Sequence, residues 1–335
     1  MPERRIGITA TVPVEILFAA GCTPVDLNNL FINDPDPLGL VSAVEDQGFP
    51  QSYCAWIKGI YAVASRDRFG EILIVTQGDC SNTLALSELL AARGLIVYKF
   101  AYPYDRQPGQ LVAEMAKLAD SLGTDLNEAT DWLARLASVR EKLGELDNLT
   151  WQEYKVMGEE NLKWLVASSD FQGNPESFER KLDEFLNEAR ERVPKKPGLR
   201  LALTGVPPIL GDLYEVLATL DAGVVLNEMP RQFSMPDATG NLAETYLAYT
   251  YPYDIFHRLD NLEREVKRRK VDGILHYVQS FCYRQLGEML MRERIDLPIL
   301  TVEADRPGEV SDAMKTRLEA FIEMLKMGKS SFDNG

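Results

Sequence analysis

The sequence predicts an α/β fold made of two parallel-sheet units with a helical insert between them. Short β-rich segments alternate with helix-like segments in the first and last thirds of the chain, and this alternation is typical of a parallel sheet with helices on its faces. The middle of the chain has apolar residues at helical spacing and no convincing strand. A chain of 335 residues is also too long for one ordinary hydrophobic core, so we expect more than one domain.

Residues 1–107 are expected to form the first α/β unit. Its β-rich segments are short, and helix-like segments lie between them. The predicted strands are Arg5–Ala10, Glu71–Thr76 and Leu95–Phe100, and the predicted helices include Val14–Ala20 and Ser81–Arg93.

Residues 108–198 are expected to form a helical region that ends in a linker. Leu, Ala, Glu, Lys and Arg dominate this stretch, and apolar residues recur at helical spacing, as at Leu126, Trp132, Leu133 and Leu136. The segment Val193–Gly198 is rich in proline and lysine, which indicates a linker.

Residues 199–335 return to the alternating pattern and are expected to form the second α/β unit. The predicted strands are Leu199–Thr204, Gly223–Asn227, Val271–Val278 and Pro298–Glu303, and a closing helix is predicted at Arg317–Met327.

The phrase Tyr-Pro-Tyr-Asp occurs twice, at 102–105 and 251–254. One interpretation is a turn signal reused by chance. The other is that both units derive from one ancestral unit and place matching loops around one cleft.

Composition and charge limit the function classes. The hydrophobic and charged fractions, 45% and 26%, are those of a globular protein. The formal charge of −15 argues against nucleic acid or an anionic membrane as the main partner, although it leaves room for a local basic pocket that binds a phosphate. No apolar run is long enough to span a bilayer and no apolar stretch follows the first basic residues, so we expect a cytoplasmic protein.

Three of the four cysteines lie in similar phrases, each interpreted as the place where a strand ends and a helix begins. The phrases surround Cys54, Cys80 and Cys282. Ligands gather at the carboxyl ends of parallel strands, and three converging thiolates would suit a soft metal, most readily iron and sulfide. The alternative for each cysteine is an ordinary buried thiol. No Cys-x-x-Cys pair and no G-x-G-x-x-G after a strand occur, so zinc-ribbon and standard dinucleotide patterns are absent.

Polar residues beside these cysteines are candidates for the surroundings of a cluster. They are Gln77, Asp79, Ser81 and Gln279. For Asp79 and Ser81 the alternative role is capping of the helix that follows. The basic run Lys267–Lys270 is interpreted as a solvated helix end, with a coenzyme A phosphate site as the alternative.

Several of these phrases together resemble the 2-hydroxyacyl-CoA dehydratase and benzoyl-CoA reductase family of iron–sulfur proteins. The likeness spans both α/β units. The similar stretches are Ile8–Leu27, Phe49–Cys54, Val75–Ser81, Asp272–Leu275 with Phe281–Cys282, and Leu297–Asp305 with Thr316–Glu323.

The resemblance implies two Rossmann-like units with a helical region, and one [4Fe–4S] cubane per chain. It implies that Cys54, Cys80 and Cys282 hold the cluster with one iron left open for chemistry. Cys22, where the family usually has a small apolar residue, is either a buried thiol or a fourth ligand. A cluster of higher nuclearity would need further ligands.

The resemblance also implies partners and an activity. Family members form homodimers or heterodimers of related subunits, and a separate ATP-dependent iron–sulfur activator supplies low-potential electrons. We therefore expect an oxygen-sensitive redox enzyme subunit that uses these electrons for radical dehydration or reduction of its substrate, as a 2-hydroxyacyl-CoA dehydratase-like lyase or as an ATP-dependent reductase component. The alternatives are an activator-dependent reductase of small substrates without coenzyme A, and a non-catalytic cluster-bearing protein for electron transfer or assembly. The sequence does not identify the substrate.

Overall fold

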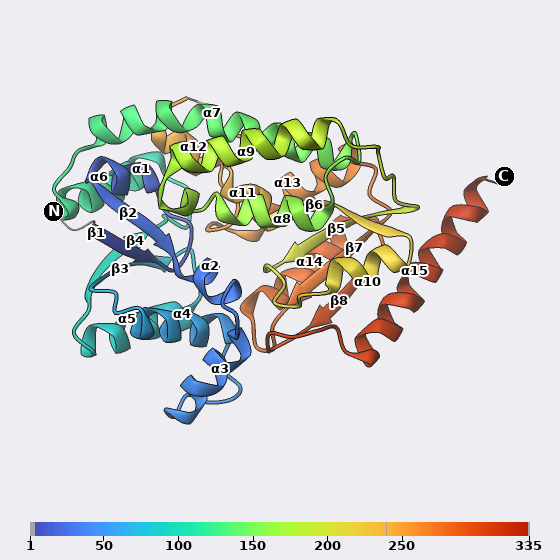
Figure 1. The fold of residues 1–335 in the computed structure, drawn as a ribbon, viewed down its shortest axis with the longest axis horizontal. Helices are drawn as coiled ribbons and strands as arrows, with labels where there is room; N and C mark the ends of the chain where they lie inside the picture. The colour runs from blue at the N-terminus through green and yellow to red at the C-terminus, as the bar shows by residue number, and fades with distance from the viewer. Residues whose placement is uncertain (1–3, 239, 334–335) are drawn as a thin grey trace. The chain divides into compact units, whose positions relative to one another are not determined.

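The computed structural model describes residues 4–238 and 240–333. It confirms the predicted α/β class: the strands form two four-stranded sheets in which every neighbouring pair is parallel (Figure 1). The chain divides into two compact units with one sheet each. Unit 1 comprises the chain up to Gly144, Trp164–Glu184 and Gln232–Arg258, and unit 2 comprises Glu145–Lys163, Phe185–Arg231 and the chain from Leu259 onward.

Unit 1 is built on a sheet of order β2-β1-β3-β4. Helices α1 and α6 lie on one face of this sheet and α4 and α5 on the other, as expected when parallel strands are joined by right-handed crossovers (Figure 1). The elements are β1 (Arg4–Ile8), α1 (Val14–Ala19), β2 (Cys22–Asp26), α2 (Leu27–Ile32), α3 (Pro37–Asp46), α4 (Ala55–Arg66), β3 (Glu71–Gln77), α5 (Ser81–Ala92), β4 (Ile96–Ala101), α6 (Pro108–Leu122), the 3₁₀ helix η1 (Phe171–Gly173) and α12 (Leu242–Ala248).

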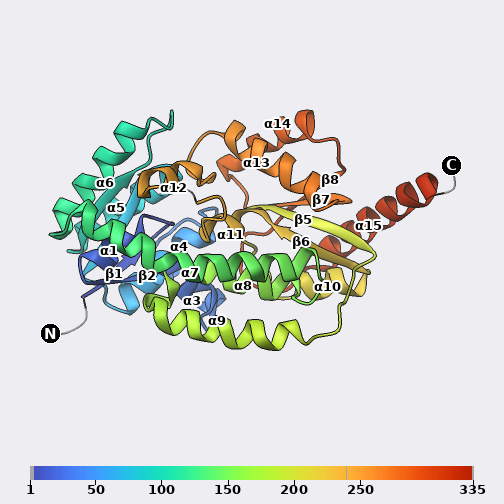
Figure 2. The same cartoon turned by 90° about the horizontal axis from the view of Figure 1, so that it is seen from above.

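Unit 2 repeats this topology with a sheet of order β6-β5-β7-β8. Figure 2 shows α13 and α14 on one face of the sheet and α10 and α15 on the other. The elements that lie wholly in this unit are β5 (Leu199–Gly205), α10 (Leu213–Thr219), β6 (Ala222–Asn227), β7 (Gly273–Val278), the 3₁₀ helix η2 (Tyr283–Leu286), α14 (Gly287–Arg294), β8 (Ile299–Glu303) and α15 (Asp312–Asp333).

The remaining helices contain the points where the chain passes between the units. They are α7 (Leu126–Trp151), α8 (Gly158–Ala167), α9 (Pro175–Arg190), α11 (Glu228–Phe233) and α13 (Ile255–Arg268). The compact units therefore divide the chain differently from the predicted ranges 1–107, 108–198 and 199–335, because the helical stretch contributes residues to both units. Within that stretch, the described residues 108–192 contain helices and no strand, as predicted.

Seven of the eight strands fall on predicted segments, and β2 is the exception. Its sequence, Cys-Thr-Pro-Val-Asp, contains a proline and is only five residues long. Proline is tolerated in a strand at the edge of a sheet, where its missing amide costs no ladder bond, and β2 is an edge strand. The weak local signal explains why the sequence did not reveal it.

The two sheets have equivalent connections, so their strands can be matched one to one. β1, β2, β3 and β4 correspond to β5, β6, β7 and β8. In each sheet the second strand pairs with one side of the first strand, and the third strand pairs with its other side. This reversal makes a topological switch point, and ligands of open α/β sheets bind outside the carboxyl ends of the strands there.

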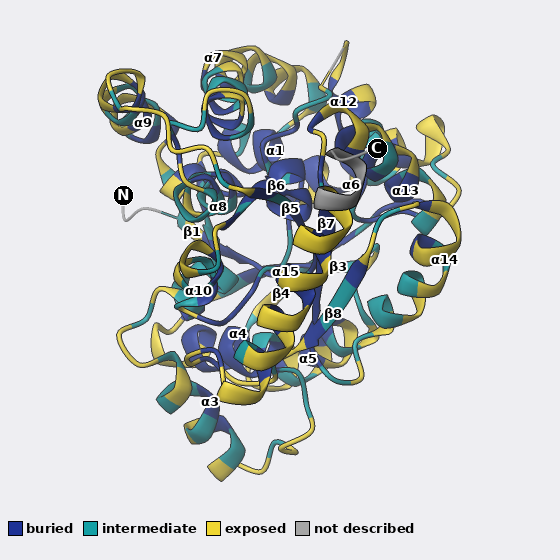
Figure 3. Cartoon of the chain, turned by 90° about the vertical axis from the view of Figure 1, so that its right-hand side faces the viewer, coloured by how far each residue is buried: buried dark blue, intermediate teal, exposed yellow. Residues whose placement is uncertain are grey.

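Both sheets are buried between their helices, and this fixes the strand ends in place. The central strands read as continuous apolar runs, because both faces of a parallel sheet are covered. Figure 3 shows the strands mainly in the colour of buried residues, while α15 presents an exposed face. Fully buried side chains include Ile6, Ile8, Ile72, Leu73 and Ile74 in unit 1 and Leu201, Ala202, Ile274, Leu275 and Val302 in unit 2.

The repeated Tyr-Pro-Tyr-Asp phrase does not mark equivalent loops of the two units. The first copy follows β4, whereas the second precedes α13, and both copies belong to unit 1. In the second copy, Asp254 accepts hydrogen bonds from the amides of Phe256 and His257, at 2.8 and 3.0 Å, and so supports the start of α13.

Candidate functional site

Cys80 lies at the carboxyl end of β3, at the switch point of unit 1, and is the N-cap residue of the 12-residue helix α5. Asp79 holds the turn: its carboxylate accepts hydrogen bonds from the Cys80 amide at 2.8 Å and from the Thr83 hydroxyl at 3.0 Å. The Thr83 hydroxyl is also 3.5 Å from the Cys80 sulfur. The predicted strand-to-helix setting of Cys80 is confirmed, and its thiol points toward hydrogen-bonding groups of the first helical turn.

The groups around Cys80 shift the pKa of its thiol in opposite directions. Burial raises the pKa of this thiol, and the neighbouring Asp79 carboxylate raises it further. The Thr83 hydroxyl and the amides of Asn82 and Thr83, at the start of α5, lower the pKa. Binding of a metal cation would remove the proton and use the same donors to stabilise the thiolate.

Gly78 places two Tyr-Pro segments of unit 1 against the Cys80 loop. Its φ of +104° is a conformation that side-chain-bearing residues rarely adopt. A Cβ atom at this position would lie 2.8 Å from Cβ of Pro252 and 3.0 Å from the Tyr102 ring. The rings of Tyr102 and Tyr253 are in edge contact, with centroids 5.7 Å apart. The repeated phrase therefore packs twice around one cysteine loop.

Cys54 is the N-cap residue of the 12-residue helix α4, but it does not follow a strand. The sequence interpretation was wrong on this point: the loop before Cys54 comes from helix α3. Buried Lys58 holds that loop, because its ammonium donates to Glu45 at 2.6 Å and to the Gln51 carbonyl at 2.8 Å. Since α4 leads into the parallel strand β3, its N-terminus lies toward the carboxyl edge of the sheet, as Cys80 does.

Tyr53, in unit 1, is influenced by both Cys54 and Cys80. Burial raises the pKa of the Tyr53 phenol, and charge on Cys80 and on Cys54 raises it further. The Tyr53 phenol therefore responds to charge on both thiols. No sequence signal assigned Tyr53 to the site, although it directly precedes Cys54.

Cys282 occupies the position in unit 2 that Cys80 occupies in unit 1. It follows β7, the strand equivalent to β3, and is the N-cap residue of η2. The Cys282 amide donates to the Gln279 carbonyl at 3.1 Å. The amide and the hydroxyl of Ser280 both donate to Asp305, at 2.7 Å each. The loop is thus fixed by the end of β8, while Phe281 beside the cysteine is 84% exposed.

Cys22 lies at the opposite end of its sheet from Cys80. It is the first residue of β2 and pairs with Arg4 at the amino end of β1, whereas Cys80 follows the carboxyl end of β3. Its buried thiol donates to the Ala20 carbonyl at 3.7 Å, and burial raises its pKa. We therefore do not include Cys22 in the candidate site.

The four polar residues that the sequence singled out have different positions. Asp79 fixes the Cys80 turn, as described above. Gln77 and Ser81 are exposed, and Gln279 is buried at the end of β7. Asp79 bonds directly to a cysteine residue, through the Cys80 amide.

A pair of buried carboxylates lies at the carboxyl end of β2, and sequence reasoning missed it. Asp170 accepts a hydrogen bond from the Asp26 amide at 2.7 Å, and the Ser169 hydroxyl donates to Asp26 at 2.6 Å. Burial and the neighbouring Asp26 raise the pKa of Asp170 to about 7. The pair can hold a proton at neutral pH. No local signal joins these residues, because they are 144 positions apart.

The candidate metal ligands are divided between the units, with two thiols in unit 1 and one in unit 2. Across residues 4–238 and 240–333, no group of three or more His, Cys, Asp or Glu side chains is arranged to hold a metal ion. What the three cysteines share is local: each is the N-cap residue of a helical turn and is partly exposed.

Comparison with known proteins identifies the family. The chain belongs to the family described as "2-hydroxyglutaryl-CoA dehydratase, D-component", which matches residues 9–325. It is also similar to the Escherichia coli (strain K12) protein named "Putative dehydratase subunit YjiM". The two are 23% identical over 368 residues, which cover 97% of this chain and 93% of that protein. The resemblance inferred from the cysteine phrases is thus confirmed, and the chain is a dehydratase-like subunit.

No helix in the described part of the chain is both long enough and apolar enough to cross a membrane.

Proposed function

We propose that this protein is a cytoplasmic iron–sulfur subunit of a 2-hydroxyacyl-CoA dehydratase-type enzyme, and that Cys54, Cys80 and Cys282 hold a [4Fe–4S] cluster. The observation that supports this most directly is the equivalent placement of Cys80 and Cys282. Each follows the third strand of a sheet at the switch point where ligands bind. Cys54 supports it further, because it caps α4 in unit 1, and the start of this helix lies toward the same edge of the sheet as Cys80.

The donor set fits such a cluster. Thiolates are the usual ligands of iron–sulfur clusters, and three of them leave one iron available to a substrate oxygen. Amides at the start of the 12-residue helices α4 and α5 stabilise negative charge on Cys54 and Cys80. The Thr83 hydroxyl lies 3.5 Å from the Cys80 sulfur and has one proton, which it can donate either to Asp79 or to a thiolate at Cys80.

The proposed reaction is removal of water from a 2-hydroxyacyl-CoA thioester. When bound, the cluster supplies one low-potential electron to the substrate. Elimination of water leaves the substrate with no net change in electron count, so that electron is returned and can be used again. The protein residues position the substrate and exclude water from the reacting groups.

A partner is part of this proposal, because a dehydratase component of this family implies an activator. We infer an ATP-dependent iron–sulfur activator and a dimer with an identical or related subunit. Exposed apolar side chains next to Cys282 support docking of another protein at this edge of unit 2, since clustered exposed apolar groups mark interaction sites. They are Phe281, Tyr283, Leu286 and Met289.

The test is iron and sulfide analysis with EPR spectroscopy on protein purified without oxygen. We expect about four irons per wild-type chain, a typical cubane content, and loss of most iron in Cys54→Ala, Cys80→Ala and Cys282→Ala. The matched control is Cys22→Ala, which removes a buried thiol at the opposite edge of the sheet and should keep the iron. Wild-type protein without iron, or a control that alone loses it, would refute the proposed ligand set.

Turnover assays then separate the reaction types. With activator and ATP present, a 2-hydroxyacyl-CoA is expected to lose water, and a small unsaturated acid without coenzyme A is expected to be left unreduced. Reduction of the small acid without dehydration of the thioester would assign the protein to the reductases. Neither reaction by an iron-loaded protein would favour a non-catalytic carrier.

A further inference from the structure

A large basic cavity lies at the amino edge of the second sheet, the edge opposite to Cys282. It has a volume of about 970 Å³ and is lined where β5, β6 and β7 begin, at Arg200, Asp221 and Asp272. Cys282 follows the other end of the six-residue strand β7. At about 3.3 Å per residue the strand separates the two edges by roughly 20 Å, so the cavity is not part of the proposed cluster site.

Two basic segments that the sequence placed apart meet at this cavity. The predicted linker contributes Lys196, and the basic run before β7 contributes Arg268 and Lys270. With Arg200 and Lys329, five basic side chains line the cavity against two carboxylates, although the whole chain carries a formal charge of −15. A local positive charge on an acidic protein indicates a specific anion.

Part of this positive charge is not compensated. Lys329 pairs with Asp272 at 3.0 Å, and Arg268 pairs with Glu265 at 2.6 Å. Within the described residues, Lys196 and Lys270 form no ion pair, and the buried Nε of Arg200 has no hydrogen-bond partner. An anion in the cavity would supply the missing acceptors.

Aromatic rings lie directly beside these cations. The Arg268 guanidinium lies over the Trp151 ring at 4.9 Å, and the Arg200 guanidinium lies over the Tyr154 ring at 5.2 Å. Arg200 also donates to the Trp151 carbonyl at 3.2 Å. Flat aromatic and guanidinium surfaces stack on planar nitrogenous bases, while lysines bind phosphates as point charges.

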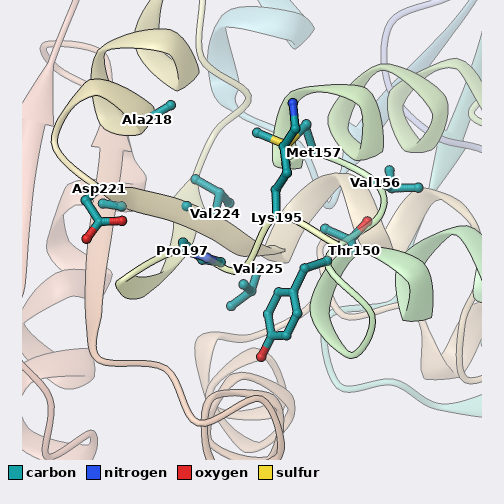
Figure 4. Close-up of a pocket in the computed structure, with 13 residues that line it drawn as sticks. Thr150, Val156, Met157, Lys195, Pro197, Ala218, Asp221, Val224 and Val225 are labelled. Carbon is teal, nitrogen blue, oxygen red and sulfur yellow. The ribbon is translucent and has the colours of Figure 1, made fainter. Parts of the chain in front are cut away.

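A second, smaller cavity adjoins the basic one. Its volume is about 140 Å³, and it shares Tyr154, Pro197 and Asp221 with the larger cavity. Figure 4 shows Pro197 and Asp221 with the apolar residues Met157, Val224 and Val225 around this hollow. An apolar hollow beside a cationic opening matches a molecule with a planar apolar end and a charged end.

We propose that the amino edge of unit 2 binds a nucleotide, with its phosphates at Lys196 and Lys270 and its base against Trp151 and Tyr154. The ligand is either a free nucleoside polyphosphate or the nucleotide end of a larger cofactor. Because the site is remote from Cys282, it acts by anchoring or regulation rather than by chemistry. This inference does not depend on the iron–sulfur proposal.

The test is isothermal titration calorimetry of the full chain with ATP, ADP, coenzyme A and tripolyphosphate. We expect saturable binding of at least one nucleotide-containing ligand, weakened at least tenfold by the double substitution Lys196→Glu/Lys270→Glu. The matched control is Lys117→Glu/Lys163→Glu, which makes the same charge change at exposed lysines outside the cavity and should leave the affinity unchanged. Binding of ATP or ADP identifies a free nucleotide, and binding of coenzyme A alone identifies the end of a larger cofactor.

A second variant tests whether the nucleotide base contacts Trp151. Trp151→Ala is expected to weaken nucleotide binding tenfold or more while leaving tripolyphosphate binding within twofold, with folding verified by circular dichroism. The proposal is overturned if no nucleotide-containing ligand binds at millimolar concentration, if both charge variants weaken binding equally, or if tripolyphosphate binds as tightly as the nucleotides.

Discussion

The two units share one topology, but they use opposite charges to fix the same long helix. In unit 1, Arg140 of α7 forms a 2.7 Å ion pair with fully buried Glu15, and Tyr246 donates to the same carboxylate at 2.8 Å. In unit 2, Asp147 of α7 binds Arg269. A buried charge without a partner is costly, so each unit specifies where its part of α7 must lie.

The unit 2 cluster is the more connected of the two. Arg269 donates to the Val225 carbonyl at 2.7 Å and to Glu265 at 3.0 Å in addition to Asp147. Although burial alone would raise it, the pKa of Asp147 is lowered by Arg269 and Arg231. The fold is thus repeated, while the buried polar contacts are particular to each unit.

The largest expected effect comes from breaking these clusters. Arg269→Ala leaves Asp147 and Glu265 buried without their main cation, and we expect a loss of about 3–5 kcal/mol in the free energy of unfolding, measured by urea denaturation. Arg140→Ala in unit 1 should cost a similar amount. The control is Lys267→Ala, an exposed position near the end of α13. It should change the free energy of unfolding little. Equal, small losses in all three variants would show that the buried pairs do not stabilise the units.

A smaller effect is expected at the loop that carries Cys80. Gly78→Ala combines an unfavourable positive φ with contacts to Pro252 and Tyr102, whereas Gly94→Ala has a positive φ of +90° and no atom within 4 Å. We expect about 1 kcal/mol of destabilisation for Gly94→Ala from backbone conformation and about 1–3 kcal/mol more for Gly78→Ala from overpacking. Thermal unfolding measures both. A Gly78 variant no worse than the Gly94 variant would contradict the packing of the Tyr-Pro segments on this loop.

The smallest effect is a pH dependence confined to unit 1. Asp170 has a pKa of about 7 in the folded protein against an ordinary 3.8. Between these values the folded state holds more protons than the unfolded state, so stability falls as the pH rises from about 4 to 7. The stability of Asp170→Asn relative to wild type should be roughly 1–3 kcal/mol greater at pH 8 than at pH 5, given about 1.4 kcal/mol per pKa unit.

Urea denaturation at several pH values measures this difference. The control is Asp131→Asn, an exposed position on α7, which should parallel the wild type across the range. If the stability of the Asp170 variant fell with rising pH as steeply as that of wild type, Asp170 would be ionised in the folded protein at neutral pH.

Local sequence patterns predicted the α/β class, seven of the eight strands and the setting of Cys80 and Cys282 between strand and helix. These features are local: an apolar run followed by a small polar turn and a helical pattern is written in a few consecutive residues. The family likeness rested on the same short phrases.

Features that join residues far apart in the chain became visible only in the folded structure. The proline-containing strand β2 forms because β1 offers it an edge, and that strand takes Cys22 away from Cys80. The helical stretch is shared between the units, and the buried carboxylate pair and the basic cavity each join distant segments. Such contacts are set by which surfaces pack together, and no window of neighbouring residues contains that information.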